Sequence, residues 1–91
     1  MAKEFAWSSE KNDALKRERG ISFERVVVEI AQGNLLDVLA HPNTGKYGHQ
    51  MLLVVRIDEY VYAVPCVDSE TELFLKTIIP SRKLTRHYEA P

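Results

Sequence analysis

The strongest constraint on the fold is a change of hydrophobic periodicity at Gly33. Between residues 21 and 33 the apolar residues recur at three- and four-residue spacing, which gives a helix one buried stripe. From residue 51 onward the apolar segments are short, continuous and rich in β-branched and aromatic residues, as is typical of strands. The chain is therefore expected to place helices before Gly33 and most of its sheet after it.

Two helices are predicted before Gly33, and both have recognisable ends. Residues 8–20 begin with serine caps, carry acids early and bases late, and finish at a glycine, an order that complements the helix dipole. Residues 21–33 repeat this order, with Ser22 as the cap and Gly33 as the stop. A short aromatic strand over residues 4–7 is expected to precede them.

Strand-forming segments dominate the second half of the chain. Residues 51–57 and 60–67 are separated only by Asp58 and Glu59, a spacing that predicts a tight hairpin. A third strong strand is expected over residues 73–79, because that segment is again apolar and β-branched.

The segments around these strands are less regular. Residues 34–40 can form either a strand or the end of a helix, whereas residues 41–50 hold a proline and two glycines and predict an exposed loop. Pro80 is expected to stop the last strand, and Ser81 is expected to cap a final short helix over residues 82–88.

These elements define an α+β fold in which two N-terminal helices pack on an antiparallel sheet and a short C-terminal helix follows. Ninety-one residues suffice for one core, so residues 1–91 are expected to form a single domain. No apolar run approaches the roughly 20 residues of a membrane span and no secretory signal is recognisable, so a cytoplasmic protein without membrane contact is expected. The single cysteine, Cys66, lies in an apolar segment and is expected to be buried rather than reactive.

Three histidines, His41, His49 and His87, raise the question of a metal site. None of them is spaced three or four residues from another histidine or from a carboxylate cluster, and the chain has no pair of cysteines. A glycine-rich phosphate loop and a nucleophile elbow are also absent from the sequence. Neither a metal nor another cofactor is therefore expected.

The basic C-terminal segment carries the clearest functional information. The chain has a formal net charge of -1, yet no acidic residue falls between residues 73 and 88. The basic residues gathered there are Lys76, Arg82, Lys83, Arg86 and His87. In a helix, Arg82 and Arg86 share one face, while Leu84 and Tyr88 lie on a roughly opposite face toward the sheet. Paired guanidinium groups match phosphate geometry, but a solvated charged face gives the same pattern, so charge alone leads only to a candidate RNA or phosphate binder.

Three blocks of the sequence resemble BrnT-type toxins, the ribonuclease halves of bacterial type II toxin–antitoxin pairs, whose fold is similar to that of RelE toxins. The first block is "FAWSSEKNDALKRERGISFERV", with Lys-Asn in its first helix and Ser-Phe-Glu after a basic helix end. The second is the central hairpin "LLVVRIDEYVYAV", and the third is the closing segment "KTIIPSRKLTRHYE". Family members often end the first helix with Lys-His-Gly, where this chain has Glu18-Arg19-Gly20.

The resemblance implies a metal-independent ribonuclease in which the ribose 2′-OH attacks the adjacent phosphorus, which confines cleavage to RNA. It implies that Arg82 and Arg86 form the phosphate clamp and that Lys11, with Arg17 and Arg19, faces them from the first helix. Positive donors at this place would stabilise the transition state, which is more negative than the substrate.

The resemblance leaves the general base open. Its candidates are His49, Glu59 and Lys76, the last because neighbouring cations lower the pKa of a lysine. The residues expected to bind RNA are Lys16, Arg17, Arg19, Lys83 and Tyr88, although Tyr88 can equally be a packing anchor for the last helix.

The same resemblance implies a partner. A cognate antitoxin, of ribbon-helix-helix type, is expected to cover the basic groove between the first and last helices with an acidic segment. A heterotetramer is one assembly that this pairing allows. The alternative function is that of a non-catalytic relative, a module that binds a protein or RNA without cutting it.

Overall fold

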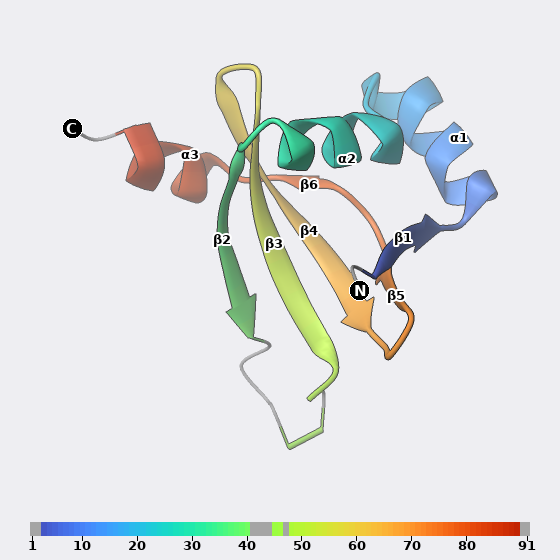
Figure 1. Ribbon diagram of the computed structural model, residues 1–91. Coiled ribbons are helices and arrows are strands. Elements are labelled where there is room, and N and C mark those ends of the chain that lie inside the picture. The colour runs from blue at the N-terminus through green and yellow to red at the C-terminus, as the bar shows by residue number, and fades with distance from the viewer. Residues whose placement is uncertain (1–2, 41–44, 47, 90–91) are drawn as a thin grey trace.

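The computed structural model describes residues 3–40, 45–46 and 48–89. Its elements are, in order, β1 (Glu4–Trp7), α1 (Ser9–Arg19), α2 (Phe23–Ala31), β2 (Leu35–Ala40), β3 (Gln50–Ile57), β4 (Tyr60–Asp68), β5 (Glu72–Leu75), β6 (Ile79–Pro80) and α3 (Arg82–Glu89). The α+β class is confirmed, and residues 35–40 form a strand (Figure 1). Much of the predicted loop over residues 41–50, including His41, lies outside the described residues.

The predicted ends of the first helix and the start of the second are confirmed. The Ser8 hydroxyl caps α1 by accepting a hydrogen bond from the Lys11 N–H (3.2 Å), and Gly20 ends the helix in the left-handed region at φ 67°. The Ser22 hydroxyl caps α2 in the same way by accepting from the Arg25 N–H (3.1 Å). Glycine adopts positive φ without steric cost, so α1 can stop there and the chain can turn into α2.

The sheet is mixed rather than wholly antiparallel, which corrects the predicted arrangement. Its strands lie in the order β1-β5-β4-β3-β2, with β6 also paired to β4. Every pair is antiparallel except β1 with β5, where Phe5 lies beside Leu73 and Trp7 beside Leu75. Side chains alternate between the two faces of a strand in the same way whichever direction the strand runs. The sequence pattern therefore does not reveal that β1 runs parallel to its neighbour.

The predicted final strand is interrupted, which is a second correction. Leu75 lies opposite Cys66 and Ile79 lies opposite Ala63, so three intervening residues face only two residues of β4. One of those two is Pro65, which has no N–H to donate to the ladder. The extra residue divides the segment into β5 and β6, and the proline expected to stop the strand is the last residue of β6.

Helix α2 crosses one face of the sheet and closes the main core (Figure 1). The buried residues of this core are Leu15, Ile21, Phe23, Val26, Leu53, Val55, Ile57, Val64, Cys66, Leu75 and Ile78. The Trp7 and Phe23 rings stack over it with centroids 5.7 Å apart. The expected burial of Cys66 is confirmed: its side chain is fully buried, and this burial raises the pKa of the thiol to about 11.

Helix α3 covers part of the opposite face. Val55 and Ile57 of β3 point into the main core, so Arg56 between them points to the other side. There Arg56 donates a hydrogen bond from Nη2 to the backbone oxygen of Tyr88 in α3 (3.2 Å). The sheet is therefore enclosed by α2 on one face and, over part of its length, by α3 on the other.

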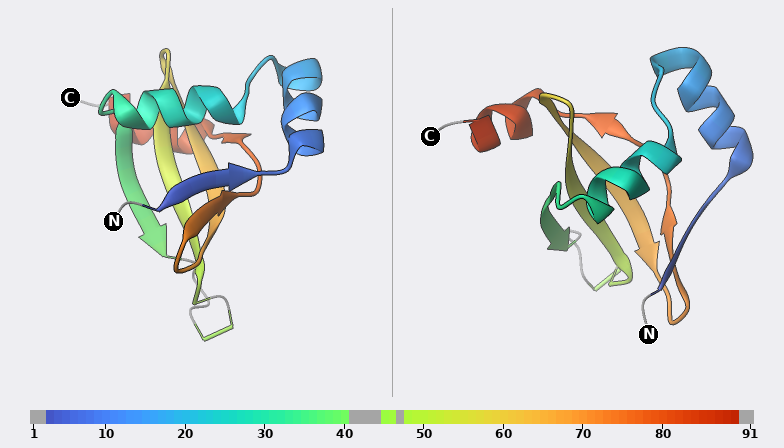
Figure 2. Two further views of the ribbon diagram at one scale, coloured as in Figure 1. Left: turned by 45° about the vertical axis from the view of Figure 1, so that its right-hand side comes forward. Right: turned by 45° about the horizontal axis from the view of Figure 1, so that its top comes forward.

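Helix α1 lies beside the sheet and not across it, so only one of the two N-terminal helices packs on the sheet as predicted (Figures 1 and 2). Its attachment runs through Asn12, which is buried. The Asn12 side chain accepts a hydrogen bond from the Phe23 N–H (2.8 Å) and donates one to Glu24 Oε1 (2.8 Å). Asn12 thereby joins α1 to the first turn of α2.

Candidate nucleic-acid interface

The last helix is fixed to the sheet by two hydroxyl side chains. The Ser81 hydroxyl caps α3 by accepting from the Leu84 N–H (3.1 Å), as predicted. The buried Thr85 hydroxyl donates to the Ser81 carbonyl oxygen (2.7 Å) and accepts from the Val61 N–H of β4 (2.9 Å). These bonds hold the inner side of α3 against β4 and turn its other side to solvent.

The exposed side of α3 carries Arg82, Lys83 and Arg86, which are together called the α3 cationic face. Leu84 and Tyr88 are half-buried toward the sheet, which confirms the predicted division of the helix. Within the described residues, no carboxylate pairs with any of the three cations of the α3 cationic face. A cluster of cations without counterions attracts anions such as RNA phosphates.

Several cations elsewhere are already engaged within the chain. Lys3 pairs with Asp68, Lys16 with Glu24, and Arg25 with both Glu29 and Asp58. Arg19 and Arg56 donate to backbone carbonyl oxygens. Lys11, Arg17 and Lys76 are exposed, and the first two belong to α1, which lies apart from α3.

The predicted groove between the first and last helices does not form. Figure 1 and both views of Figure 2 place α1 and α3 on opposite sides of the molecule, with α2 and the sheet between them. The four α1 residues expected to face the clamp, or to bind RNA beside it, are Lys11, Lys16, Arg17 and Arg19. The spacing of residues in the sequence predicts which side chains share a face of each helix. It contains no information on where α1 lies relative to α3.

Of the predicted bases, His49 lies away from α3 and Lys76 lies between the two ends of β4. The carbonyl oxygen of His49 accepts from the Asp68 N–H (2.7 Å) at one end of β4, whereas α3 packs on Val61 near the other end. Val61 and Asp68 are seven residues apart along β4, which at about 3.3 Å per residue is about 23 Å. Lys76 donates its N–H to the Pro65 carbonyl oxygen (2.8 Å), partway along the same strand.

The side chains better placed beside α3 are Glu59 and His87. Glu59 lies in the β3–β4 turn, at the end of β4 on which α3 packs. His87 is exposed on α3 itself, four residues after Lys83, and its ring meets the Tyr88 ring edge-on with centroids 4.9 Å apart. From the sequence, His87 was counted among the basic residues and tested as a metal ligand but was not proposed as a base, although its spacing from Lys83 places it on the cationic side of the helix.

A second cationic region is a pocket of about 470 Å³ between the α1–α2 junction and the β3–β4 hairpin, called here the α1–α2 pocket. Its lining residues are Lys16, Arg19, Gly20, Ile21, Ser22, Arg25, Ile57, Asp58 and Tyr62. Two of the residues expected to bind RNA, Lys16 and Arg19, belong to it, whereas Lys11 and Arg17 do not.

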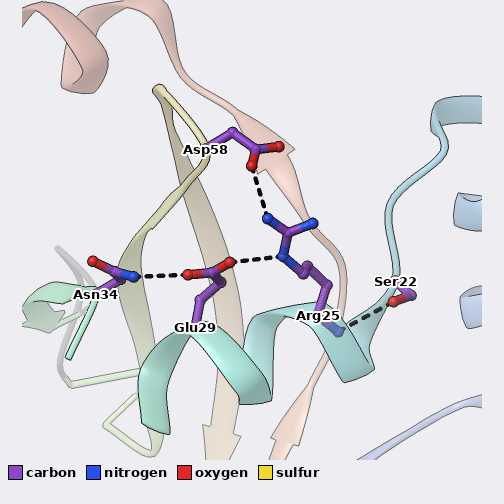
Figure 3. A network of polar contacts seen from close by, with 5 residues as sticks. All are labelled: Ser22, Arg25, Glu29, Asn34 and Asp58. Atoms are coloured by element: carbon purple, nitrogen blue, oxygen red, sulfur yellow. Dashed lines mark hydrogen bonds and ion pairs between the residues drawn. The ribbon is translucent and has the colours of Figure 1, made fainter. Parts of the chain in front are cut away.

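Arg25 and Asp58 of this pocket belong to a network of charged and amide groups that extends beyond it (Figure 3). Arg25 donates from Nε to Glu29 (2.7 Å) and from Nη2 to Asp58 (2.8 Å), and Asn34 donates to the second oxygen of Glu29 (2.7 Å). The bond from Arg25, followed by that from Asn34, lowers the pKa of Glu29. The i, i+4 spacing of Arg25 and Glu29 was visible in the sequence, but the link to Asp58 was not.

The turn that presents Asp58 depends on an unusual backbone conformation. Asp58 has φ 59°, the positive value that a two-residue hairpin requires at its first central position. Aspartate tolerates this region better than most side chains. The predicted hairpin is thus confirmed, and its geometry aims a carboxylate at Arg25.

The described residues contain no group of three or more histidine, cysteine, aspartate or glutamate side chains that is placed to hold a metal ion. Among the same residues, no helix is long and apolar enough to cross a membrane. Comparisons with protein-family models, with curated proteins and with solved structures found no match to this chain.

Proposed function

We propose that this protein is a metal-independent endoribonuclease, the toxin of a type II toxin–antitoxin pair with a RelE-like fold. The observation that supports the proposal best is the α3 cationic face, whose three cations are exposed and lack carboxylate partners within the described residues. Arg82 and Arg86 lie one helical turn apart, so their guanidinium groups can contact one phosphate or two adjacent ones.

In the proposed reaction, a base removes the proton of a ribose 2′-OH. The resulting oxygen attacks the adjacent phosphorus, a 2′,3′-cyclic phosphate forms as the bond from phosphorus to the 5′-oxygen breaks, and the leaving 5′-oxygen takes a proton from water. Arg82 and Arg86 bind the phosphate oxygens, whose negative charge increases in the transition state, and so they stabilise the transition state more than the substrate. His87 is the proposed base, because histidine is the most frequent general base and this one lies on the same exposed side of α3.

The proposed regulator is a cytoplasmic antitoxin of ribbon-helix-helix type that covers the α3 cationic face. An acidic segment suits that face by charge, and the association should weaken as salt increases. Two copies of each chain in a heterotetramer would follow if the antitoxin is a dimer. Hydrogen exchange of the complex should protect residues 82–89; protection confined to α1 would contradict this docking site.

A second candidate function is RNA or protein binding without catalysis. It is favoured by the position of His49, one of the three bases expected from the sequence, which lies at the far end of β4 from α3.

The test is cleavage of total RNA by the purified chain in the presence of EDTA. We expect shortened RNA with 2′,3′-cyclic phosphate ends, and growth arrest when the chain is produced without an antitoxin. Loss of activity in EDTA would contradict the proposed mechanism. Binding of RNA without any cleavage, with and without ribosomes, would instead establish the second candidate function.

A further inference from the structure

The α1–α2 pocket combines an excess of positive charge with apolar walls. Its charged lining residues are Lys16, Arg19, Arg25 and Asp58, three cations against one carboxylate. Its large apolar and aromatic lining residues are Ile21, Ile57 and Tyr62. A ligand that suits both sets must carry negative charge at one end and a flat or apolar body at the other.

Two of the cations can give hydrogen bonds to such a ligand. Arg19 donates from Nη1 to the Ile78 carbonyl oxygen (3.1 Å), a single contact that orients a guanidinium group with five donors. Lys16 lies 3.7 Å from a Glu24 oxygen, beyond hydrogen-bonding distance, and its side chain is half exposed. The Arg19 fork is therefore positioned in advance, while Lys16 can turn toward a bound anion.

The other charged pair of the pocket has a different role. Arg25 is held by Glu29 and Asp58 (2.7 and 2.8 Å), so its charge is balanced within the protein. Asp58 accepts from Arg25 through one carboxylate oxygen, and the other can accept from a ribose hydroxyl or a base N–H. The hydroxyls of Ser22 and Tyr62 add further polar groups to the lining.

We propose that the α1–α2 pocket binds a single nucleotide unit of RNA, with its phosphate on Arg19 and Lys16 and its base against Tyr62. The pocket volume of about 470 Å³ lies within the range of about 300–1,000 Å³ that is usual for small-molecule sites. The role of this pocket as an RNA subsite rests on the proposed function. Because the pocket is separate from the α3 cationic face, it would hold a nucleotide away from the cleaved bond. Binding of a free nucleotide does not depend on cleavage.

The aromatic wall favours a nucleotide over an acidic peptide. Cations alone would be sufficient to bind the carboxylates of a peptide. The Tyr62 ring beside the cations adds a stacking surface that accepts any nucleic-acid base. Tyr62 is half-buried, so its ring is fixed by the core while part of it remains accessible from the pocket.

The experiment is a titration of the isotope-labelled full chain with each of the four nucleoside 5′-monophosphates, followed by amide chemical shifts. We expect saturable shifts in residues 16–25 and 57–62, and weaker binding of inorganic phosphate and of unphosphorylated nucleosides. Arg19→Gln should lower the affinity at least about tenfold, because it removes a hydrogen bond to a charged group. Tyr62→Leu should bring nucleotide affinity down to that of inorganic phosphate, whereas Tyr62→Phe should retain most of it.

Lys3→Gln is the matched control, because it removes one positive charge outside the pocket and should leave nucleotide affinity unchanged. If Arg19→Gln disturbs the fold, Arg19→Lys supplies the same test, since it keeps the charge and loses the fork. Shifts confined to residues 82–89, equal binding of phosphate and nucleotides, or binding of a glutamate-rich peptide but not of nucleotides would each overturn the inference. Nucleotide binding without RNA cleavage would support the nucleotide site and contradict the proposed ribonuclease activity. RNA cleavage without chemical shift changes on adding nucleotides would support the ribonuclease activity and contradict the nucleotide site.

Discussion

The two cationic regions of this protein differ in what surrounds their charges. In the α1–α2 pocket, Arg25 is held by two carboxylates and Arg19 by a backbone carbonyl oxygen. On the α3 cationic face, Arg82 and Arg86 have no carboxylate partner among the described residues. A cation that is paired with carboxylates, like Arg25, mainly stabilises the fold, whereas a cation without a close carboxylate partner keeps its charge for a ligand.

This comparison separates two kinds of substitution. Replacing Arg25 should cost stability, because it leaves Glu29, which is only 7% exposed, without its ion-pair partner. Replacing Arg82 or Arg86 should cost function and leave stability unchanged.

The largest expected effect is on the rate of RNA cleavage. Arg82→Ala and Arg86→Ala should each reduce the rate roughly a hundred- to a thousandfold, since one charged donor to a transition state typically contributes about 2.7–4 kcal/mol. Single-turnover cleavage of a defined RNA measures this rate, and thermal unfolding should show no change in midpoint. Arg82→Lys should restore only part of the rate, because lysine keeps the charge but not the bidentate fork.

His49→Ala is the control for this series, since His49 lies at the far end of β4 and should not affect the rate. Equal rates for wild type and Arg82→Ala would remove the α3 cationic face from the mechanism. A loss in His49→Ala as large as in His87→Ala would reject His87 as the base.

The second effect concerns how α3 is attached. Thr85→Val keeps the shape of the side chain but leaves the buried Val61 N–H without its acceptor, which should lower the free energy of unfolding by about 1–3 kcal/mol. Urea denaturation measures the change. Thr85→Ser retains the hydroxyl and should be much closer to wild type. A stable Thr85→Val variant beside a destabilised Thr85→Ser variant would assign the stability to the threonine methyl group instead.

The helices and the hairpin could be predicted because their causes are local. Serine caps, the terminal glycine of α1 and the two residues at the β3–β4 turn act within a few positions of the chain, whereas the C-cap of α2 is Gln32, one residue before the expected Gly33. The parallel pairing of β1 and the division of the last strand could not be predicted in this way. The parallel pairing depends on which edge of the sheet is free for β1, and the division of the last strand depends on Pro65 of the neighbouring strand β4. Neither cause lies in the segment that it affects.

The candidate sites show the same limit. The exposed cations of α3 followed from helical spacing within one segment. The position of α1 instead depends on Asn12, whose buried amide joins two helices, and a polar residue in an amphipathic helix gave no sign of that role. For this reason the α1 cations were expected to face α3, although helix α1 lies on the other side of the molecule from α3 (Figure 2).

A smaller effect should appear in the dependence of stability on pH. Bonds from Arg25 and Asn34 lower the pKa of Glu29, so the folded protein holds this proton less tightly than the unfolded chain. The resulting stabilisation is complete above about pH 4.5 and is lost as the pH falls through the lower, folded-state value. Urea midpoints between pH 6 and pH 3 should therefore decline less steeply in Glu29→Gln than in wild type. Parallel curves would show that the Arg25 network does not contribute through this charge.

The smallest expected effect tests the outer edge of the α1–α2 pocket. Lys16 and Glu24 are 3.7 Å apart with both side chains about half exposed, and such surface pairs contribute little to stability because solvent screens them. Lys16→Gln should therefore leave the unfolding midpoint unchanged within error, while Arg25→Gln, in the same pocket, should lower it. If Lys16→Gln destabilises the protein as much as Arg25→Gln does, Lys16 belongs with the paired structural cations, and its charge is not available to a ligand.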